Sequence, residues 1–129
     1  MGDSYPGEFD VGAAARRIRS EEEREARIRL ERFRDASRQV DSALAVLRGF
    51  PSVRRVILWG SILRPERFSG ISDIDICVEG VTDPREWSRL EQELLQVITL
   101  PLDLVSWESL MEPHRESIVA RGKVMYEQD

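Results

Sequence analysis

The chain has 129 residues, of which 41% are hydrophobic and 33% charged, and its net charge is −5. This size suits one domain with a buried core, no apolar run reaches the roughly 18 residues that span a bilayer, and the absence of signal-peptide features predicts a cytoplasmic location. A single cysteine, Cys77, excludes an internal disulfide, and one Cys with one His disfavours a zinc site.

The first part of the chain predicts a tail and a helical arm. Residues 1–11 are expected to be a disordered tail. Residues 12–49 contain no proline and are rich in Ala, Arg and Glu, which predicts a long helix. Apolar residues recur every three or four positions from about residue 33, so residues 33–48 should pack on the core while the preceding part projects. A solvated charged helix and a partner-binding arm both remain open for that part.

Residues 50–129 predict one domain of the α/β (α+β) class, a small mixed sheet flanked by helices. Helical segments are expected at 61–67, 83–97 and 107–120, and strands at 53–59, 72–78, 102–106 and 122–126. In the second helix Asp83 should be the N-cap and Pro84 the first helical residue. The predicted core face of that helix consists of Trp87, Leu90, Leu94, Leu95 and Ile98.

The remaining aromatic residues and the cysteine have simpler interpretations. Cys77 lies between two apolar residues and should be a small core residue. Trp59 is also expected in the core. Trp107 follows a strand and could either pack or line a pocket for a base, whereas His114 is expected on the surface.

The charge is divided unevenly along the chain. Residues 1–64 carry 13 Arg and 10 Asp or Glu, a net charge of +3, whereas residues 65–129 carry 6 Lys or Arg and 14 Asp or Glu, a net charge of −8. An acidic C-terminal half argues against nucleic acid as a direct partner.

Two acidic residues interrupt an apolar strand. Asp73 and Asp75 are two positions apart, so they should lie on one face of the strand 72–78. Two carboxylates about 4 Å apart repel by roughly 4 kcal/mol at an effective dielectric near 20. This repulsion predicts either a shared proton or a divalent cation, and Mg²⁺ binds both carboxylates and substrate phosphates.

Gly60 and Ser61 end the preceding apolar run and predict an anion site. Glycine lets a ligand approach the backbone, and free N–H groups at the start of a helical turn favour phosphate. A third acid, Asp103, lies in another apolar strand. Three carboxylates on neighbouring strands suit a two-metal phosphoryl or nucleotidyl transfer, in which the third can help to deprotonate the attacking hydroxyl.

In combination these motifs resemble the minimal nucleotidyltransferases of the DNA polymerase β superfamily, which occur as the antitoxin of HEPN/MNT toxin–antitoxin pairs. The resemblance covers about residues 50–127 and implies a polymerase β-like fold. It also implies transfer of a nucleoside monophosphate, AMP from ATP, onto a hydroxyl of a HEPN-type toxin. Two Mg²⁺ ions would be held by the catalytic residues Asp73, Asp75 and Asp103, and the nucleotide would be bound by Gly60, Ser61, Arg64 and Ser72.

The turn after Ser61 departs from the family pattern. The family commonly has Arg-small-Arg-Gly, whereas this chain has Ile62-Leu63-Arg64-Pro65. One cation near the phosphates is therefore missing and proline stiffens the turn. Triphosphate affinity could be reduced, or another arginine, such as Arg67, could substitute.

Two other functions remain open at this stage. The chain could be a catalytically weak binding module that neutralises a partner by direct association. It could also be a dimeric, aminoglycoside-like nucleotidyltransferase for small molecules, with the active site completed across a homo-oligomer interface.

Overall fold

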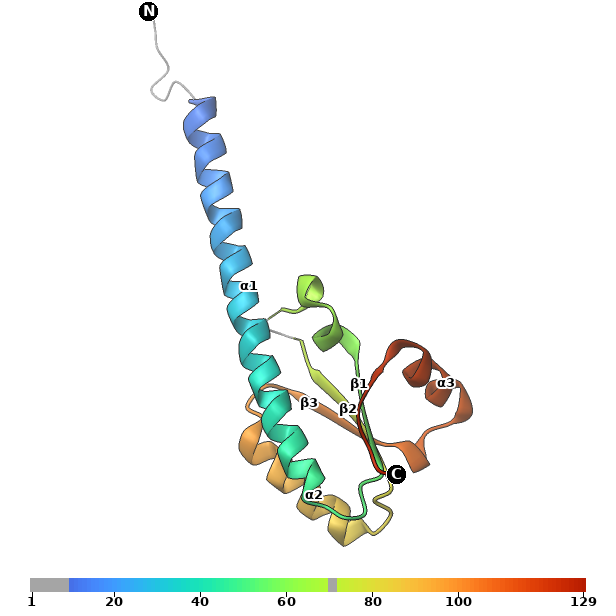
Figure 1. The fold of residues 1–129 in the computed structure, drawn as a ribbon. Coiled ribbons are helices and arrows are strands. Elements are labelled where there is room, and N and C mark those ends of the chain that lie inside the picture. The colour runs from blue at the N-terminus through green and yellow to red at the C-terminus, as the bar shows by residue number, and fades with distance from the viewer. Residues whose placement is uncertain (1–9, 70–71) are drawn as a thin grey trace, which may run out of the picture.

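The computed structural model describes residues 10–69 and 72–129, and its centre is a four-stranded mixed sheet (Figure 1). The strand order is β3-β2-β1-β4; β1 pairs antiparallel with β2 and β4, and β2 pairs parallel with β3. The strand bounds are Arg55–Trp59 for β1, Ile74–Glu79 for β2, Leu102–Ser106 for β3 and Lys123–Glu127 for β4. The predicted fold class is confirmed.

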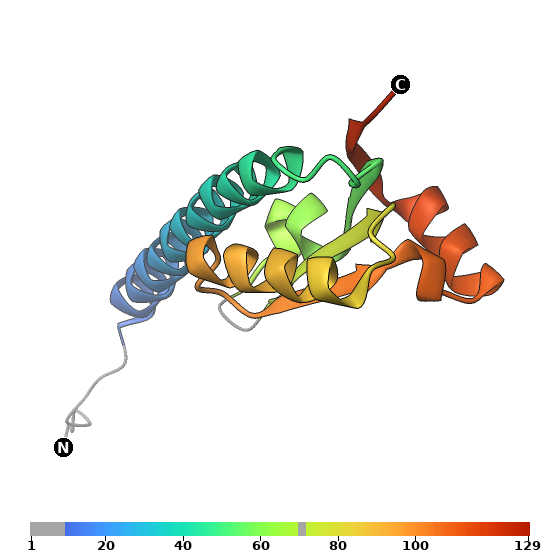
Figure 2. The same cartoon turned by 90° about the horizontal axis from the view of Figure 1, so that it is seen from below.

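Three helices cover the sheet, α1 (Val11–Arg48), α2 (Pro84–Val97) and α3 (Glu112–Arg121). Figure 2 shows α1 and α2 on one side of the sheet, with α3 on the other. Side chains alternate between the two faces of each strand. Val56 and Leu58 of β1 join the larger core cluster with α1 and α2, whereas Ile57 joins a smaller cluster with Cys77 and Ile118 of α3.

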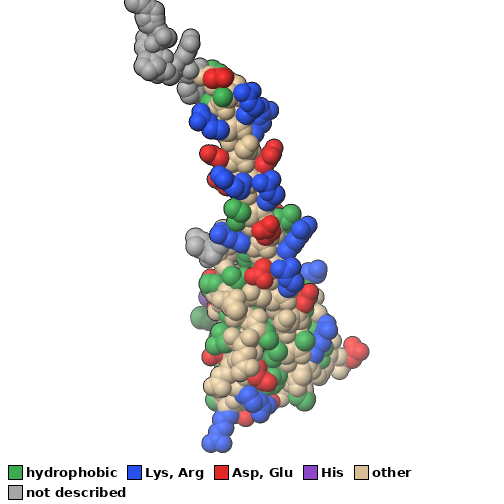
Figure 3. Space-filling model, turned by 90° about the vertical axis from the view of Figure 1, so that its left-hand side faces the viewer, with side chains coloured by type: hydrophobic (Ala, Val, Ile, Leu, Met, Phe, Trp, Pro, Cys, Tyr) green, Lys and Arg blue, Asp and Glu red, His purple; other side chains and the backbone are tan. Residues whose placement is uncertain are grey.

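Only the C-terminal part of α1 is packed against the domain. Asp10 caps the helix, since its carboxylate accepts a 3.0 Å hydrogen bond from the backbone N–H of Ala13. Residues 15–32 are exposed, and this part projects away from the sheet with charged side chains along it (Figures 1 and 3). Burial begins at Ala36 and includes Gln39, Val40, Ala43, Leu44 and Leu47. Of the predicted tail, residues 1–9 lie outside the described part of the chain.

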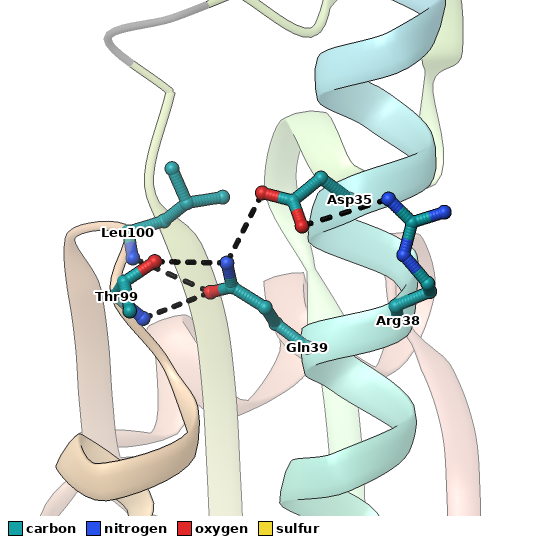
Figure 4. A network of polar contacts seen from close by, with 5 residues as sticks. All are labelled: Asp35, Arg38, Gln39, Thr99 and Leu100. Atoms are coloured by element: carbon teal, nitrogen blue, oxygen red, sulfur yellow. Dashed lines mark hydrogen bonds and ion pairs between the residues drawn. The ribbon is translucent and has the colours of Figure 1, made fainter.

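Gln39 links α1 to the turn that follows α2 (Figure 4). Its side-chain oxygen accepts hydrogen bonds from the backbone N–H groups of Thr99 at 2.9 Å and Leu100 at 3.3 Å. Its side-chain nitrogen donates to the Thr99 hydroxyl at 2.9 Å and to the Asp35 carboxylate at 3.2 Å. Gln39 is only 9% exposed, so this one side chain satisfies polar groups where little water reaches.

We expect Gln39→Leu to lower the free energy of unfolding by roughly 1–3 kcal/mol, because two backbone N–H groups lose their partner. Urea denaturation measures this loss. Gln96→Leu is the matched control, since Gln96 is exposed on α2 and should change stability little. Equal stability of the two variants would contradict a structural role for the Gln39 network.

Four local predictions differ from the structure. The strand predicted from residue 72 begins at Ile74, so Asp73 lies just before β2 and not in the strand. The expected helical segment 61–67 consists of two 3₁₀ turns, Gly60–Leu63 and Pro65–Arg67, because proline disfavours helical geometry at the preceding residue. The strand predicted from residue 53 begins at Arg55, since the Val53 N–H is used in a turn with the Phe50 carbonyl. Leu95 is 56% exposed, so its placement in the core was wrong; it lies one position, about 100°, beyond the buried Leu94.

Within residues 10–69 and 72–129, no helix has both the length and the apolar character needed to cross a bilayer.

Candidate active site

The register of three strands brings two of the predicted acids together. Asp75 is paired with Trp59 of β1 on one side and with Asp103 of β3 on the other. Cys77, two residues after Asp75 in β2, belongs to the cluster beneath α3, so the two carboxylates lie on the α3 face of the sheet. They occupy the edge at which β1 ends and β2 and β3 begin.

The backbone of Gly60 lies against the Asp75 carboxylate. It has a φ of +83°, and a Cβ at this position would lie 2.1 Å from the Asp75 Oδ2 atom. Only glycine avoids both the steric overlap and the strain of a positive φ. Gly60 therefore allows the Asp75 carboxylate to lie directly against the turn that follows β1.

The environment of Asp75 disfavours its ionised form. Burial, the negative charges of Asp103 and Asp73, and a hydrogen bond with Asp103 raise the pKa of Asp75 from 3.8 to about 6. The pair can relieve this repulsion by holding a proton or by binding a cation. A divalent cation would replace the shared proton and let both carboxylates ionise.

The carboxylates around Asp75 supply part of the ligand set of a hard divalent cation. Across the described residues, no three Asp, Glu, His or Cys side chains converge closely enough to form a complete metal site alone. Asp73 immediately precedes β2 and is exposed, whereas Asp75 and Asp103 are in contact. Mg²⁺ is usually bound by only one or two carboxylates together with substrate phosphates. The Asp75–Asp103 pair fits that pattern.

A cavity of about 440 Å³ opens beside Gly60. Three arginines line it: Arg64 lies between the two 3₁₀ turns, Arg67 ends the second turn, and Arg121 ends α3. None of the described acidic residues forms an ion pair with these arginines. Three unpaired guanidinium groups around one cavity favour a multiply charged anion. The remaining lining residues are Trp59, Gly60, Ser61, Leu63 and Ser117.

Residues 42–129 match the family described as Polymerase beta, Nucleotidyltransferase. The chain belongs to this nucleotidyltransferase family. The match covers the whole sheet, α2, α3 and the end of α1, and thus every element that carries the carboxylates and the arginine-lined cavity. No curated protein matches the chain.

Solved structures with a similar fold include toxin–antitoxin complexes. A chain in a toxin–antitoxin complex with AMP-PNP is 26% identical to this chain with a TM-score of 0.56, and the alignment covers 67% of this chain and 71% of that chain. The tri-AMPylated HEPN toxin of Shewanella oneidensis with its MNT antitoxin has 24% identity and a TM-score of 0.54, covering 71% and 72%. A mutant MntA–HpeT complex has 23% identity and a TM-score of 0.58, covering 69% and 73%. The last two similarities concern the fold alone.

The residues predicted to bind nucleotide fall into two groups. Gly60, Ser61 and Arg64 line the arginine cavity of the nucleotidyltransferase. Ser72 does not line it; the Ser72 hydroxyl accepts a 2.9 Å hydrogen bond from the Ser69 backbone N–H. A role for Ser72 in nucleotide binding stays a prediction.

Sequence reasoning missed what α3 contributes to the nucleotidyltransferase site. Arg121 and Ser117 line the cavity, but neither was predicted as a site residue. Ile62 is 6% exposed and packs in the core, so position 62 gives nothing to the cavity. Arg67, considered as a substitute cation, does line it.

Trp59 differs from its expected placement in the core, whereas Trp107 takes the packing role that was one of its two alternatives. Trp59 is only half-buried and lines both the arginine cavity and a second cavity of about 270 Å³, which it shares with His114 and Ile118. Trp107 lines neither of these cavities. The guanidinium carbons of Arg55 and Arg115 lie 4.4 and 5.2 Å from the centre of its ring. These cation–π contacts favour a packing role.

Cys77 is buried beneath α3, as predicted, and is expected to be chemically inert. Burial raises the pKa of the Cys77 thiol to about 11, so the reactive thiolate is scarce near neutral pH. A colorimetric thiol reagent should modify the native protein slowly and the urea-unfolded protein rapidly, to one equivalent. Fast modification of the folded protein at pH 8 would contradict this burial.

Proposed function

We propose that this nucleotidyltransferase moves AMP from ATP onto a hydroxyl of a partner protein, a HEPN-type toxin, in an Mg²⁺-dependent reaction. The observation that carries the proposal is the Asp75–Asp103 pair beside a cavity lined by three arginines. The similarity to a toxin–antitoxin complex with AMP-PNP supports the choice of an adenine nucleotide and of a toxin as the partner.

Each group in the site has a proposed task. The arginines and the Ser61 hydroxyl bind phosphate oxygens, and Gly60 lets the phosphate chain approach the backbone. Asp75 and Asp103 would hold the metal, and Asp73, which is exposed just before β2, is proposed as an additional ligand. When bound, Mg²⁺ supplies positive charge at the reacting phosphate oxygens.

The proposed reaction is a displacement at the α-phosphorus of ATP. The acceptor hydroxyl oxygen forms a bond to that phosphorus, and the bond from the phosphorus to the bridging oxygen of the β-phosphate breaks. Pyrophosphate leaves toward the arginines, and the hydroxyl proton passes to Asp103, which is exposed at the start of β3. The products are the AMP-modified acceptor and pyrophosphate.

Labelled ATP tests this proposal. The protein is incubated with Mg²⁺, a HEPN-type protein encoded beside it, and ATP labelled on either the α- or the γ-phosphorus. We expect the α-label alone to become attached to the partner, and Asp73→Asn to reduce the transfer. Tight association without transfer would instead identify a binding module that neutralises its partner directly.

A further inference from the structure

We propose that Arg121 binds the β- and γ-phosphates of the nucleotide, which become the pyrophosphate leaving group, and supplies the cation that is missing at position 62. This assignment rests on the proposed function. Arg121 is the last residue of α3 and lies outside the Gly-Ser and Asp-x-Asp motifs.

The position of the cavity relative to the carboxylates indicates which phosphates of the nucleotide bind in the cavity. Asp75 and Asp103 are not among the lining residues of the cavity, whereas Gly60 lines it and also touches Asp75. The phosphorus that reacts must lie beside the carboxylates. The next phosphates in the chain then pass Gly60 and enter the cavity, where the arginines are.

The three arginines surround the cavity from two parts of the chain. Arg64 and Arg67 come from the turn after β1, and Arg121 comes from α3, more than fifty residues later. Ile62 is turned into the core, so the turn alone offers two cations instead of three. Arg121 restores a third positive charge opposite the turn.

Gly122 is a positioning residue for Arg121. A Cβ at Gly122 would lie 2.7 Å from Ile57 Cγ2 and 2.9 Å from the Leu58 carbonyl oxygen, both in β1. The backbone after Arg121 therefore runs directly against the strand that leads into Gly60. Arg115 holds the other end of α3, since its Nε donates a 3.0 Å hydrogen bond to the Trp107 carbonyl. Two contacts thus fix where Arg121 enters the cavity.

Calorimetric titration of the protein with ATP, pyrophosphate and AMP, each with Mg²⁺, shows which phosphates Arg121 binds. We expect Arg121→Gln to weaken the binding of ATP and of pyrophosphate by the same factor, roughly tenfold or more, and to leave the affinity for AMP almost unchanged. Arg121→Lys should recover part of the loss, because lysine keeps the charge but not the two-pronged geometry. Arg85→Gln is the matched control, since Arg85 is exposed on α2 and lies outside the cavity.

A second variant tests the positioning role. Gly122→Ala should give the same ligand pattern as Arg121→Gln, with thermal melting used to confirm that it folds. The assignment of Arg121 would be overturned if Arg121→Gln bound pyrophosphate with wild-type affinity, or if it lost as much affinity for AMP as for pyrophosphate. A wild-type protein that binds no ATP would instead refute the proposed function itself.

Discussion

Gly60→Ala is expected to reduce nucleotidyl transfer by at least about a hundredfold, because the new methyl group would overlap the Asp75 carboxylate. The Cβ would lie 2.1 Å from Asp75 Oδ2, and the φ of +83° adds strain of about 1–2 kcal/mol for any residue with a side chain. Either the carboxylate or the turn must move, and both belong to the proposed site. The measurement is the initial rate of AMP transfer to the partner.

Gly80→Ala is the matched control for this prediction. Gly80 also has a positive φ, +114°, and a Cβ there would lie 2.1 Å from the Ser52 carbonyl oxygen, just beyond the far end of β2. Both variants should unfold at a lower temperature, but the folded Gly80→Ala protein should keep its transfer rate. If Gly60→Ala transfers AMP as fast as Gly80→Ala, the contact between Gly60 and Asp75 has no role in the reaction.

Asp75→Asn is expected to have opposite effects on activity and stability. Transfer should fall by roughly 10²–10³-fold or more, because the substitution removes the charge that would hold the metal. The metal-free protein should nevertheless melt at a higher temperature at pH 8, since a half-buried carboxylate repelled by Asp103 and Asp73 is replaced by a neutral amide. Thermal melting in the presence of a chelator measures the second effect.

The pH dependence of that stability difference follows from the raised pKa of Asp75. The native state holds a proton on Asp75 up to a pKa of about 6, whereas the unfolded chain releases it near 3.8. The stabilisation from this proton is complete below pH 3.8 and is lost as the pH rises through 6. The amount by which Asp75→Asn is more stable than wild type should therefore grow between pH 4 and 6 and then level off.

Asp83→Asn is the control for the pH series. It also removes one negative charge, but Asp83 is the exposed N-cap of α2, where asparagine caps equally well. Its melting temperature should follow that of wild type without a step near pH 6. A pH-independent difference between Asp75→Asn and wild type would contradict the close contact of the two carboxylates.

Part of the strand framework around the site could be predicted from sequence. The apolar run before Gly60 predicts a strand, which is β1, but the prediction that Asp73 and Asp75 lie in one strand was wrong, because β2 begins only at Ile74. Residues 102–106 were predicted as a strand with the bounds that β3 has. What spacing cannot provide is strand register, and it is the pairing of Asp75 with Asp103 that brings the carboxylates into contact.

The contribution of α3 could not be predicted, because it depends on contacts between distant parts of the chain. Arg121 has no sequence pattern that separates it from the other arginines; its place in the cavity follows from the close packing of Gly122 on β1. Trp59 looked like a core residue because it ends an apolar strand. The short α3 covers that end of the sheet only in part, which leaves the Trp59 ring half-buried beside two cavities.

The most direct test of the central claim, that the Asp75–Asp103 pair recruits a divalent cation for a nucleotide, is the thermal stability of the protein with ATP, with and without Mg²⁺. ATP at 100 times its Kd should stabilise the wild-type protein by about 2.7 kcal/mol when Mg²⁺ is present and by much less with a chelator. Asp75→Asn should lose the Mg²⁺-dependent part, whereas Asp83→Asn should retain it. Equal stabilisation by ATP with and without Mg²⁺, or an unchanged Mg²⁺ effect in Asp75→Asn, would contradict the claim.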